Sequence, residues 1–410
     1  MKGMSYNNDW FVSSPPTLQQ NKAVNERISA NQHNEHTNLL LKARRLSHKT
    51  PFMVTDLGII SNNIDRLITL LPQVDIYYAV KSNPDAQIIR TIDKKVAGYD
   101  IASLGEFEHL VALGISPERM LFSNPIKIPE HIQTTFEQGV RYFAFDSLME
   151  INKLARWAPG SNVYLRLKVS DGGSRFPLSH KFGVNVDKAI DYLTKAKYAG
   201  LNPIGLAFHV GSQSDNHMDW ELAFAASAKI IKSVANMGIH LNTLNIGGGI
   251  PAEYGQGNIN LAQIAQAIVA GQTSLSPQVR IVAEPGRSLA ATSSIIVASV
   301  IGKEKRQDSA DWLYLDMGVF QGLMEPLQFP SWRYPVHTDY DEVENRTQKY
   351  VLTGPSCDAH DTIGLDYILP IDLDLHDRIY IASAGAYTIV YASNFNGFNP
   401  PQIYYTNNAE

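Results

Sequence analysis

Cysteine is nearly absent from this chain of 410 residues, which contains only Cys357. A single cysteine cannot form an internal disulfide, so its thiol is a buried apolar group, an intermolecular partner or a reactive group. The HExxH and CxxC spacings of common zinc sites are also missing. The sequence therefore predicts no bound metal.

Long apolar runs and an excess of basic residues are absent as well. No stretch approaches the roughly 18 apolar residues of a membrane-spanning helix, and residues 1–20 contain no apolar core of signal-peptide length. The net charge of −5 does not suggest a nucleic-acid surface. We therefore predict a cytoplasmic protein that binds neither membrane nor nucleic acid. Because residues 5–36 are rich in Asn, Gln and Ser, we expect a mobile leader over residues 1–36.

The middle of the chain alternates short apolar runs with helical patterns, as parallel strands joined by crossover helices do. The expected strands are 75–80, 98–102, 120–124, 142–146, 162–169, 203–210, 243–248 and 280–285. Eight strands are the number that closes a (β/α)8 barrel, although an open doubly wound sheet would also alternate. We predict an α/β fold with a TIM-like barrel over residues 56–290.

Beyond Arg287 the pattern changes to short strand-like runs separated by Gly and Pro, which is typical of an all-β domain. The expected strands are 294–300, 312–315, 348–353, 378–382 and 402–406. The run 51–55 precedes the barrel and is expected to join the same sheet. We therefore predict a β-sandwich or β-barrel domain made of residues 37–55 and 291–410, with the TIM-like barrel inserted between them.

Polar, ionisable or glycine residues follow the predicted barrel strands. They are Lys81, Asp100, Asn124, Asp146, Arg166, His209, Gly247 to Gly249, and Glu284 with Arg287. The carboxyl ends of barrel strands face one mouth, which is where active sites lie. Loops are polar in general, so any one of these residues could be incidental. The set as a whole predicts an active site at this mouth.

Several of these residues suggest one particular chemistry. Burial would lower the pKa of Lys81, and a neutral amine can form a Schiff base with a carbonyl. Glycines 247–249 let backbone N–H groups approach an anion, and Arg287 could bind its oxygens. The glycine run matches neither GxGxxG nor a P-loop, so a phosphate without a nucleotide fits better. Together these features suggest pyridoxal 5'-phosphate, with Glu284 at the pyridine nitrogen and His209 against the ring. Taken alone, Lys81 could be a surface lysine and His209 a structural histidine.

Cys357 lies in GPSCDAHD, where Gly, Pro and Asp indicate a turn. A thiol in a turn is expected to be accessible, although a free cysteine is often a small buried apolar residue.

In their order along the chain, these motifs resemble the fold-type III (alanine racemase-like) pyridoxal-phosphate decarboxylases, the ornithine, lysine and diaminopimelate decarboxylase group. The motifs are YYAVKSN, GYDIAS, LFSNPIK, AFDS, HVGSQ, IGGG, AEPGR, GPSCD and GAYTIVYASNFNGF. They cover nearly all of the chain after the leader, and the pattern is most similar to ornithine decarboxylases. The resemblance implies a carboxy-lyase with pyridoxal 5'-phosphate as cofactor and a homodimer with shared active sites.

The resemblance also implies roles for individual residues. Lys81 would carry the cofactor as a Schiff base, with Asp100 and Arg166 orienting Lys81 and the Glu284 network, and His209 would stack on the ring. The cofactor contacts implied are Lys81, Asp100, Arg166, His209, Ser212, Gly247, Gly248, Gly249, Glu284, Gly286, Arg287 and Tyr387.

On the other subunit, the resemblance implies that Cys357 protonates the α-carbon of the substrate. The substrate contacts implied are Cys357, Asp358, Tyr387 and Phe395. Lys181 would pair with Asp361 across the interface between the subunits.

The substrate is expected to be a small basic L-amino acid of the ornithine or lysine type, converted to a diamine as in polyamine biosynthesis. Asp358 after the cysteine is ornithine-like, whereas diaminopimelate enzymes typically have Glu there. Ornithine enzymes carry a Tyr-Asp pair where this chain has Gln328 and Phe329, and Glu325 is a nearby substitute. Diaminopimelate, or a modified amino acid of a siderophore or secondary-metabolite pathway, is therefore an alternative. A racemase and a non-catalytic binding protein of the same fold are further alternatives.

Overall fold

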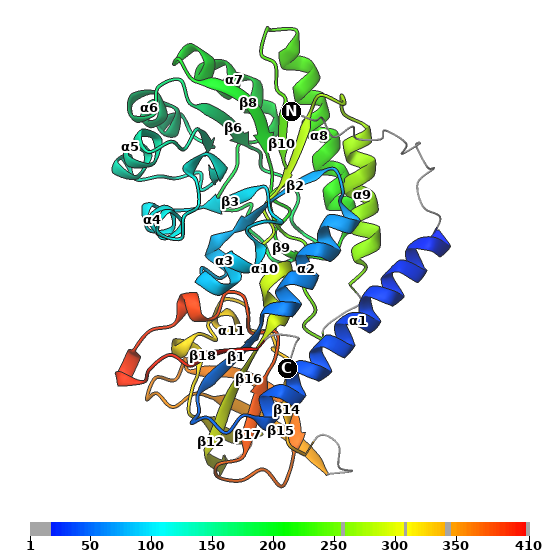
Figure 1. Ribbon diagram of the computed structural model, residues 1–410, viewed down its shortest axis with the longest axis vertical. Helices are drawn as coiled ribbons and strands as arrows, with labels where there is room; N and C mark the ends of the chain where they lie inside the picture. The colour runs from blue at the N-terminus through cyan, green and yellow to red at the C-terminus, as the bar shows by residue number, and fades with distance from the viewer. Residues whose placement is uncertain (1–17, 256–258, 307–309, 341–345, 407–410) are drawn as a thin grey trace, which may run out of the picture.

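A TIM-like barrel and a β-sheet domain lie end to end in the computed structural model (Figure 1), which describes residues 18–255, 259–306, 310–340 and 346–406. The barrel occupies the upper part of that view and the β domain the lower part. Within the described residues, no helix is both long enough and apolar enough to cross a membrane.

All eight predicted barrel strands form, and each neighbouring pair is parallel. They are β2 (Val74–Ala79), β3 (Gly98–Ile101), β4 (Met120–Phe122), β5 (Tyr142–Phe145), β6 (Asn162–Arg166), β8 (Asn202–Ala207), β10 (Thr243–Asn245) and β11 (Arg280–Ala283). The order β10-β11-β2-β3-β4-β5-β6-β8 closes on itself, which confirms the barrel over the open sheet. Each strand ends a little earlier than predicted, so most of the polar residues after the strands lie in loops at the mouth.

Helices cover the outside of the barrel. They are α2 (Leu57–Leu70), α3 (Ala86–Ile92), α4 (Leu104–Ala112), α5 (Pro129–Glu137), α6 (Leu148–Trp157), α7 (Ala189–Tyr198), α8 (His217–Ala235) and α9 (Leu261–Thr273). The short α10 (Arg287–Ala290) follows the last barrel strand at the mouth. Side chains of Ser103, Ser147 and Asn216 accept N–H groups of the first turns of α4, α6 and α8, which fixes where these helices begin. The loops between β3 and α4 and between β5 and α6 are therefore short, whereas longer loops follow β6, β8 and β10.

The β domain contains strands from both ends of the chain. They are β1 (Phe52–Asp56), β12 (Ser294–Lys305), β13 (Asp311–Leu315), β14 (Val336–Thr338), β15 (Thr347–Thr353), β16 (Thr362–Pro370), β17 (Arg378–Ile381) and β18 (Gln402–Thr406). β1 pairs antiparallel with β12 and parallel with β18, as predicted for the run 51–55. β14 and β16 were not predicted: β14 is very short, and β16 contains Gly364, Asp366 and Pro370, which are unfavourable in strands.

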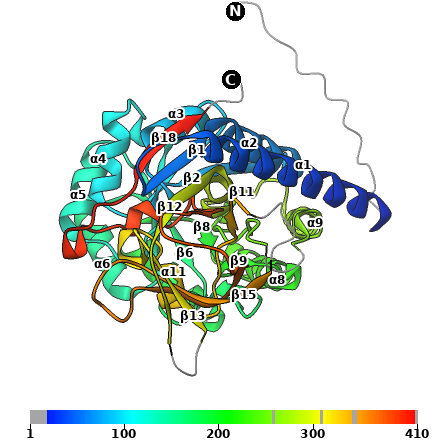
Figure 2. The same cartoon turned by 90° about the horizontal axis from the view of Figure 1, so that it is seen from below.

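Helix α1 (Leu18–Arg45) differs from the expected mobile leader. Residues 18–36 form its first part, whereas residues 1–17 lie outside the described residues. α1 runs along the outside of the molecule from the barrel to the β domain (Figures 1 and 2). Near its end, Leu39, Leu40 and Ala43 are buried against Phe52 and Val54 of β1. The polar composition of the segment hid this narrow apolar face.

Candidate active site

A cavity of about 480 Å³ lies at the carboxyl ends of the barrel strands, where the mouth faces the β domain. Its lining includes ten of the predicted site residues: Lys81, Arg166, His209, Ser212, Gly248, Gly249, Glu284, Gly286, Arg287 and Tyr387. These residues come from widely separated parts of the sequence. The closed barrel brings them together because the strands that precede most of them end at one mouth.

Lys81 lies in a short 3-10 turn, η1 (Val80–Ser82), directly after β2. Its amine forms an ion pair with Asp100 of β3, a residue that is 1% exposed. Burial alone would lower the pKa of Lys81, but the carboxylates of Asp100 and Glu284 help to raise it above its usual value. The lowered pKa expected from the sequence is therefore wrong, because the strand beside Lys81 supplies a buried carboxylate. Lys81 is an ammonium group in this arrangement.

Glu284 follows β11 and is held by neutral hydrogen-bond donors. Ser123 and Asn245 both donate to its Oε1 atom, and the Ser123 hydroxyl lies 2.6 Å from the hydroxyl of Tyr164. Burial, followed by the charge of Asp100, raises the pKa of Glu284. Both bonds end on Oε1, which leaves Oε2 of this cavity-lining residue available to a hydrogen-bond donor in the cavity.

His209 lies just after β8, and its Nδ1 atom accepts the backbone N–H of Gly211 at 3.0 Å. Burial, with the nearby charges of Arg166 and Lys81, lowers the pKa of His209 to about 3. The ring is therefore neutral at physiological pH, with its proton on Nε2. A neutral imidazole suits packing against a flat ring better than a cation that repels other positive charge.

The glycines of the IGGG motif allow neighbouring groups to pack closely, in addition to letting backbone N–H groups approach an anion. Gly247 and Gly249 have φ values of +67° and +96°, which favour glycine. A Cβ atom on Gly248 would lie 2.8 Å from the carbonyl oxygen of Glu284 and 3.2 Å from Nε2 of His209. A larger residue here would push both groups away from the cavity.

The guanidinium of Arg287 is already bound by the protein. Its Nε atom donates to the Ser212 hydroxyl at 3.0 Å, and Nη1 donates to the Tyr254 hydroxyl at 3.1 Å. Glu325 accepts from Nη1 at 2.9 Å and from Nη2, so both of its carboxylate oxygens bind Arg287. Four of the five donors of Arg287 are thus occupied, and its orientation is fixed. Because both carboxylate oxygens of Glu325 bind Arg287, Glu325 is not available to accept a hydrogen bond from the distal amine of a substrate.

One wall of the cavity is largely apolar. Phe176 packs edge-on against Phe329 at 4.3 Å between ring centres, and Tyr391 and Gln328 also line the cavity. Phe176 belongs to β7 (Ser174–Phe176), which pairs with β9 (Ser212–Ser214) beside the mouth. This wall can contact a hydrocarbon chain but presents no free carboxylate.

Five predicted site residues do not line this cavity, namely Asp100, Gly247 and three residues of the β domain. Cys357 and Phe395 are exposed on the β domain of the same chain. Asp358 accepts hydrogen bonds from the backbone N–H and the ring of His360, which lower the pKa of Asp358. These three side chains therefore lie outside the cavity that Lys81 of the same chain lines.

Asp361, the expected partner of Lys181, is fully buried within its own chain. Its carboxylate accepts the backbone N–H groups of Val319 at 2.8 Å and Ser356 at 3.0 Å. Asp361 therefore binds backbone groups of its own chain, a role that the resemblance did not imply.

Ser123, Asn245 and Tyr254 are not among the predicted site residues, and the pairing of Glu325 is not predicted either. Asn124, the residue after Ser123, is the one at the predicted end of β4. Asn245 lies inside a predicted strand, before the glycines, and so carries no signal of its own. Only the register of the closed barrel shows that both side chains reach Glu284.

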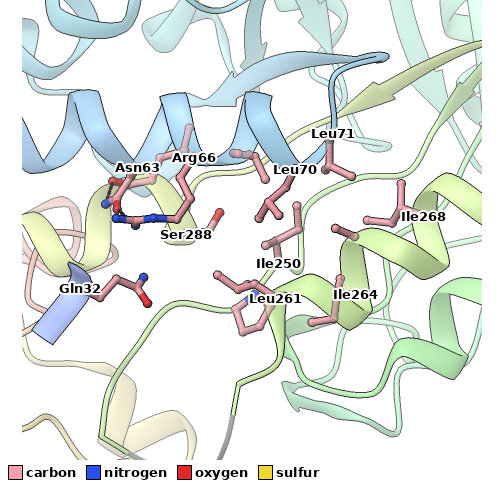
Figure 3. Close-up of a pocket in the computed structure, with 14 residues that line it drawn as sticks. Gln32, Asn63, Arg66, Leu70, Leu71, Ile250, Leu261, Ile264, Ile268 and Ser288 are labelled. Carbon is pink, nitrogen blue, oxygen red and sulfur yellow. Dashed lines mark hydrogen bonds between the residues drawn. The ribbon is translucent and has the colours of Figure 1, made fainter. Parts of the chain in front are cut away.

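A second pocket, of about 30 Å³, lies outside the barrel between α2 and α9 (Figure 3). Leu70, Ile250 and Ile264 point into it, and Arg66 at its edge bonds to Asn63 at 2.8 Å. Its small size and mainly aliphatic lining make it a packing defect, whereas the cavity at the mouth carries the ionisable groups.

The residues at the mouth fit pyridoxal 5'-phosphate. Lys81 offers an amine, Glu284 a carboxyl group for a ring nitrogen, and Ser212 with Arg287 a site for phosphate oxygens. Oδ1 of Asp100 is buried without a hydrogen-bond partner among the described residues, so this carboxylate can accept a further donor. In the described ranges, no group of three or more His, Cys, Asp or Glu side chains is arranged to hold a metal ion.

Comparison with known proteins agrees with this chemistry. Residues 57–291 match the family model of the pyridoxal-dependent decarboxylase, pyridoxal binding domain. The lysine/ornithine decarboxylase of Selenomonas ruminantium is 34% identical over 350 residues, which is 85% of this chain and 88% of that protein.

Solved structures are similar over most of their length. SrLDC in complex with PLP and cadaverine has a TM-score of 0.81 and 32% identity, and the match covers 90% of this chain and 93% of that one. The arginine decarboxylase of Paramecium bursaria Chlorella virus, bound to agmatine, has a TM-score of 0.81 and 31% identity. The match covers 88% of this chain and 98% of that one.

Proposed function

Because the chain belongs to the pyridoxal-dependent decarboxylases, we propose that it removes the α-carboxylate of a basic L-amino acid of the ornithine or lysine type and releases a diamine. The observation that carries the proposal is the convergence of Lys81, Glu284 and Arg287 on one cavity. The substrate is inferred from relatives named for ornithine, lysine and arginine. The cytoplasmic location stays a prediction.

Pyridoxal 5'-phosphate, when bound, would supply an aldehyde that condenses with amines and a ring that accepts the electron pair left on the α-carbon when carbon dioxide departs. Lys81 is the attachment point in this proposal, and Asp100 holds its amine in place before the cofactor arrives. Glu284 keeps a proton at the ring nitrogen, because its carboxyl is fixed by Ser123 and Asn245. Arg287 and Ser212 bind the phosphate.

A second copy of the chain completes the site in this proposal. Cys357 is exposed and does not line the cavity of its own chain, so it can serve a neighbouring one. Its thiol then donates the proton that replaces the lost carboxylate. Asp358 and Phe395 come from the same side of the second copy and face the substrate.

The apolar wall of Phe176, Phe329 and Tyr391 supports a substrate with a hydrocarbon chain between its α-carbon and its basic end. Because Glu325 is bound to Arg287, the distal ammonium has to find its acceptor on the second copy, and Asp358 is the proposed one. Gln328 on the same wall also favours the alternative of a modified substrate with a hydrogen-bonding group.

The test is a substrate panel scored by carbon dioxide release and by product identity. Ornithine, lysine, arginine, diaminopimelate and diaminobutyrate are compared by kcat/KM with the purified holoenzyme. We expect ornithine or lysine to lead and to give the matching diamine. A lead for diaminopimelate would contradict the proposed substrate, and a D-amino acid without carbon dioxide would contradict decarboxylation.

A further inference from the structure

Asn396 lies against the thiol of Cys357, and we propose that it is the positioning residue of the proton donor. Its side-chain oxygen holds Cys357 as a protonated thiol, aimed in one direction, until the proton is used. This inference rests on the proposed role of Cys357 and names a residue through which that role is controlled.

Two donors of Cys357 converge on one acceptor. The Sγ atom lies 3.4 Å from Oδ1 of Asn396, and the backbone N–H of Cys357 donates to the same oxygen at 3.3 Å. The two residues are 39 positions apart in the sequence, so the contact joins two separate loops. An oxygen bound by both donors fixes the thiol relative to the backbone of its own loop.

The backbone of Asn396 is in a conformation that aims this side chain. Its φ and ψ values are 53° and 17°, in the left-handed region that most side chains avoid but that asparagine tolerates better. Neighbouring contacts keep the turn in place. Phe395 packs on Phe320 at 4.5 Å between ring centres, and the N–H of Ser393 bonds to the carbonyl of Phe320 at 2.8 Å. The chain is therefore anchored to Phe320 directly before Asn396.

The nearest carboxylate does not take this position. Oδ1 of Asp358 accepts the backbone N–H of His360 at 2.8 Å and lies 2.9 Å from its Nδ1 atom. A carboxylate beside the thiol would place negative charge where the thiolate forms and so oppose donation of the proton, whereas the amide oxygen of Asn396 accepts a hydrogen bond without adding charge. The loop thus places a neutral acceptor at the thiol.

Only the protonated thiol of Cys357 can donate a proton to the substrate. An S–H group can bond to Oδ1 of Asn396 but a thiolate cannot, so the contact favours the protonated form. In the proposed step the S–H bond breaks and a C–H bond forms at the α-carbon of the decarboxylated substrate. The electron pair of the S–H bond stays on sulfur as a thiolate, which water then protonates. Asn396 holds the restored thiol for the next turnover.

The first experiment measures alkylation of Cys357 in the holoenzyme. Because Cys357 is the only cysteine, iodoacetamide incorporation followed by mass spectrometry reports on this thiol alone. Asn396→Gly keeps access to positive φ and removes the acceptor, and we expect alkylation at pH 7 to be faster by roughly fivefold, the size of one ordinary hydrogen bond. Asn396→Asp keeps an oxygen acceptor and adds negative charge, so its thiol should react more slowly than that of the wild type.

Asn394→Ala is the matched control, because Asn394 bonds to Asn399 at 2.9 Å in the same loop. It should leave alkylation unchanged. Equal rates for Asn396→Gly and the wild type would overturn the proposal, and so would faster alkylation of Asn396→Asp. Thermal unfolding of each holoenzyme shows whether a variant has simply lost its fold.

The second experiment follows where the proton goes. The readout is the fraction of turnovers that end in an aldehyde and an aminated cofactor instead of the amine product. We expect this fraction to rise several-fold in Asn396→Gly, while the rate of carbon dioxide release in a single turnover stays nearly constant. A normal product ratio in Cys357→Ala would overturn the proposed donor itself. A raised fraction in Cys357→Ala with wild-type behaviour of Asn396→Gly in both experiments would overturn only the role of Asn396.

Discussion

The two sets of residues assigned to the active site differ in how complete they are within one chain. At the barrel mouth, Lys81 pairs with buried Asp100, and Arg287 is bound by Glu325. On the β domain, Cys357 is exposed and hydrogen-bonds to Asn396 in a loop of the same domain. A single chain therefore brings together the groups that would hold the cofactor, whereas the proposed proton donor lies outside their cavity.

Replacing Lys81 should have the largest effect, because it removes the proposed attachment point at the mouth. We expect Lys81→Ala to lower kcat by about a thousandfold or more. Borohydride reduction followed by peptide mass spectrometry should find the cofactor on Lys81 of the wild type and on no lysine of the variant. Lys95→Ala, which changes a lysine bonded to Ser61 and Asp65 outside the cavity, is the control and should keep both activity and adduct. An adduct on another lysine of the wild type would contradict the assignment.

Mixing two inactive variants tests the division between the two sides directly. Lys81→Ala lacks the barrel side, and Cys357→Ala lacks the β-domain side. If sites are shared, equal mixing should restore about one quarter of the wild-type diamine formation, because half of the dimers contain both variants and one of their two sites is intact. Diamine formation is measured after the subunits have exchanged. An absence of recovery, with exchange verified by mass spectrometry, would show that each site belongs to one chain.

Breaking the Arg287–Glu325 pair should affect both cofactor binding and stability. Glu325→Gln leaves the buried guanidinium without its counter-charge, and we expect a loss of about 3 kcal/mol in the free energy of unfolding. The dissociation constant of pyridoxal phosphate should rise by roughly tenfold, because Arg287 loses its fixed orientation. Denaturant titration and cofactor fluorescence measure the two effects.

Asp366→Asn is the matched control for Glu325→Gln. Asp366 pairs with Arg333 but is 51% exposed, so its loss should cost at most about 1 kcal/mol and leave cofactor binding unchanged. Equal effects of the two variants would mean that burial of the Arg287 pair has no special role.

The smallest expected effect concerns pH and helix α1. Burial, followed by the charges of His337 and His33, lowers the pKa of His36 from 6.5 to about 4. The unfolded chain therefore binds a proton that the folded chain refuses between pH 6.5 and 4, so stability should fall as the pH drops through this window. His36→Gln should flatten that slope without abolishing it, because His209 contributes with the same sign.

Denaturant unfolding at several pH values measures this slope, with His240→Gln, which changes an exposed histidine away from His36, as control. An unchanged slope in His36→Gln would contradict the effect of burial on His36.

Periodicity was sufficient for the barrel, because all eight strands are short apolar runs separated by helices with recognisable caps. Periodicity was insufficient where burial or pairing depends on residues far away in the sequence. It did not predict α1, because that segment is mostly polar, or β16, because that strand contains Gly364 and Pro370. The site residues that follow strands were foreseen, whereas the bonds of Ser123 and Asn245 to Glu284 depend on barrel register. The shift predicted for the pKa of Lys81 had the wrong direction, because the carboxylate that raises this pKa belongs to Asp100 on the next strand.

The place of β1 between β12 and β18 has a consequence for biosynthesis. On the ribosome, β1 is made before the barrel, whereas both of its partners, β12 and β18, are made after the barrel. The barrel can fold while β1 is still unpaired. The nascent protein can therefore gain its scaffold before the sheet that contains β1 is complete.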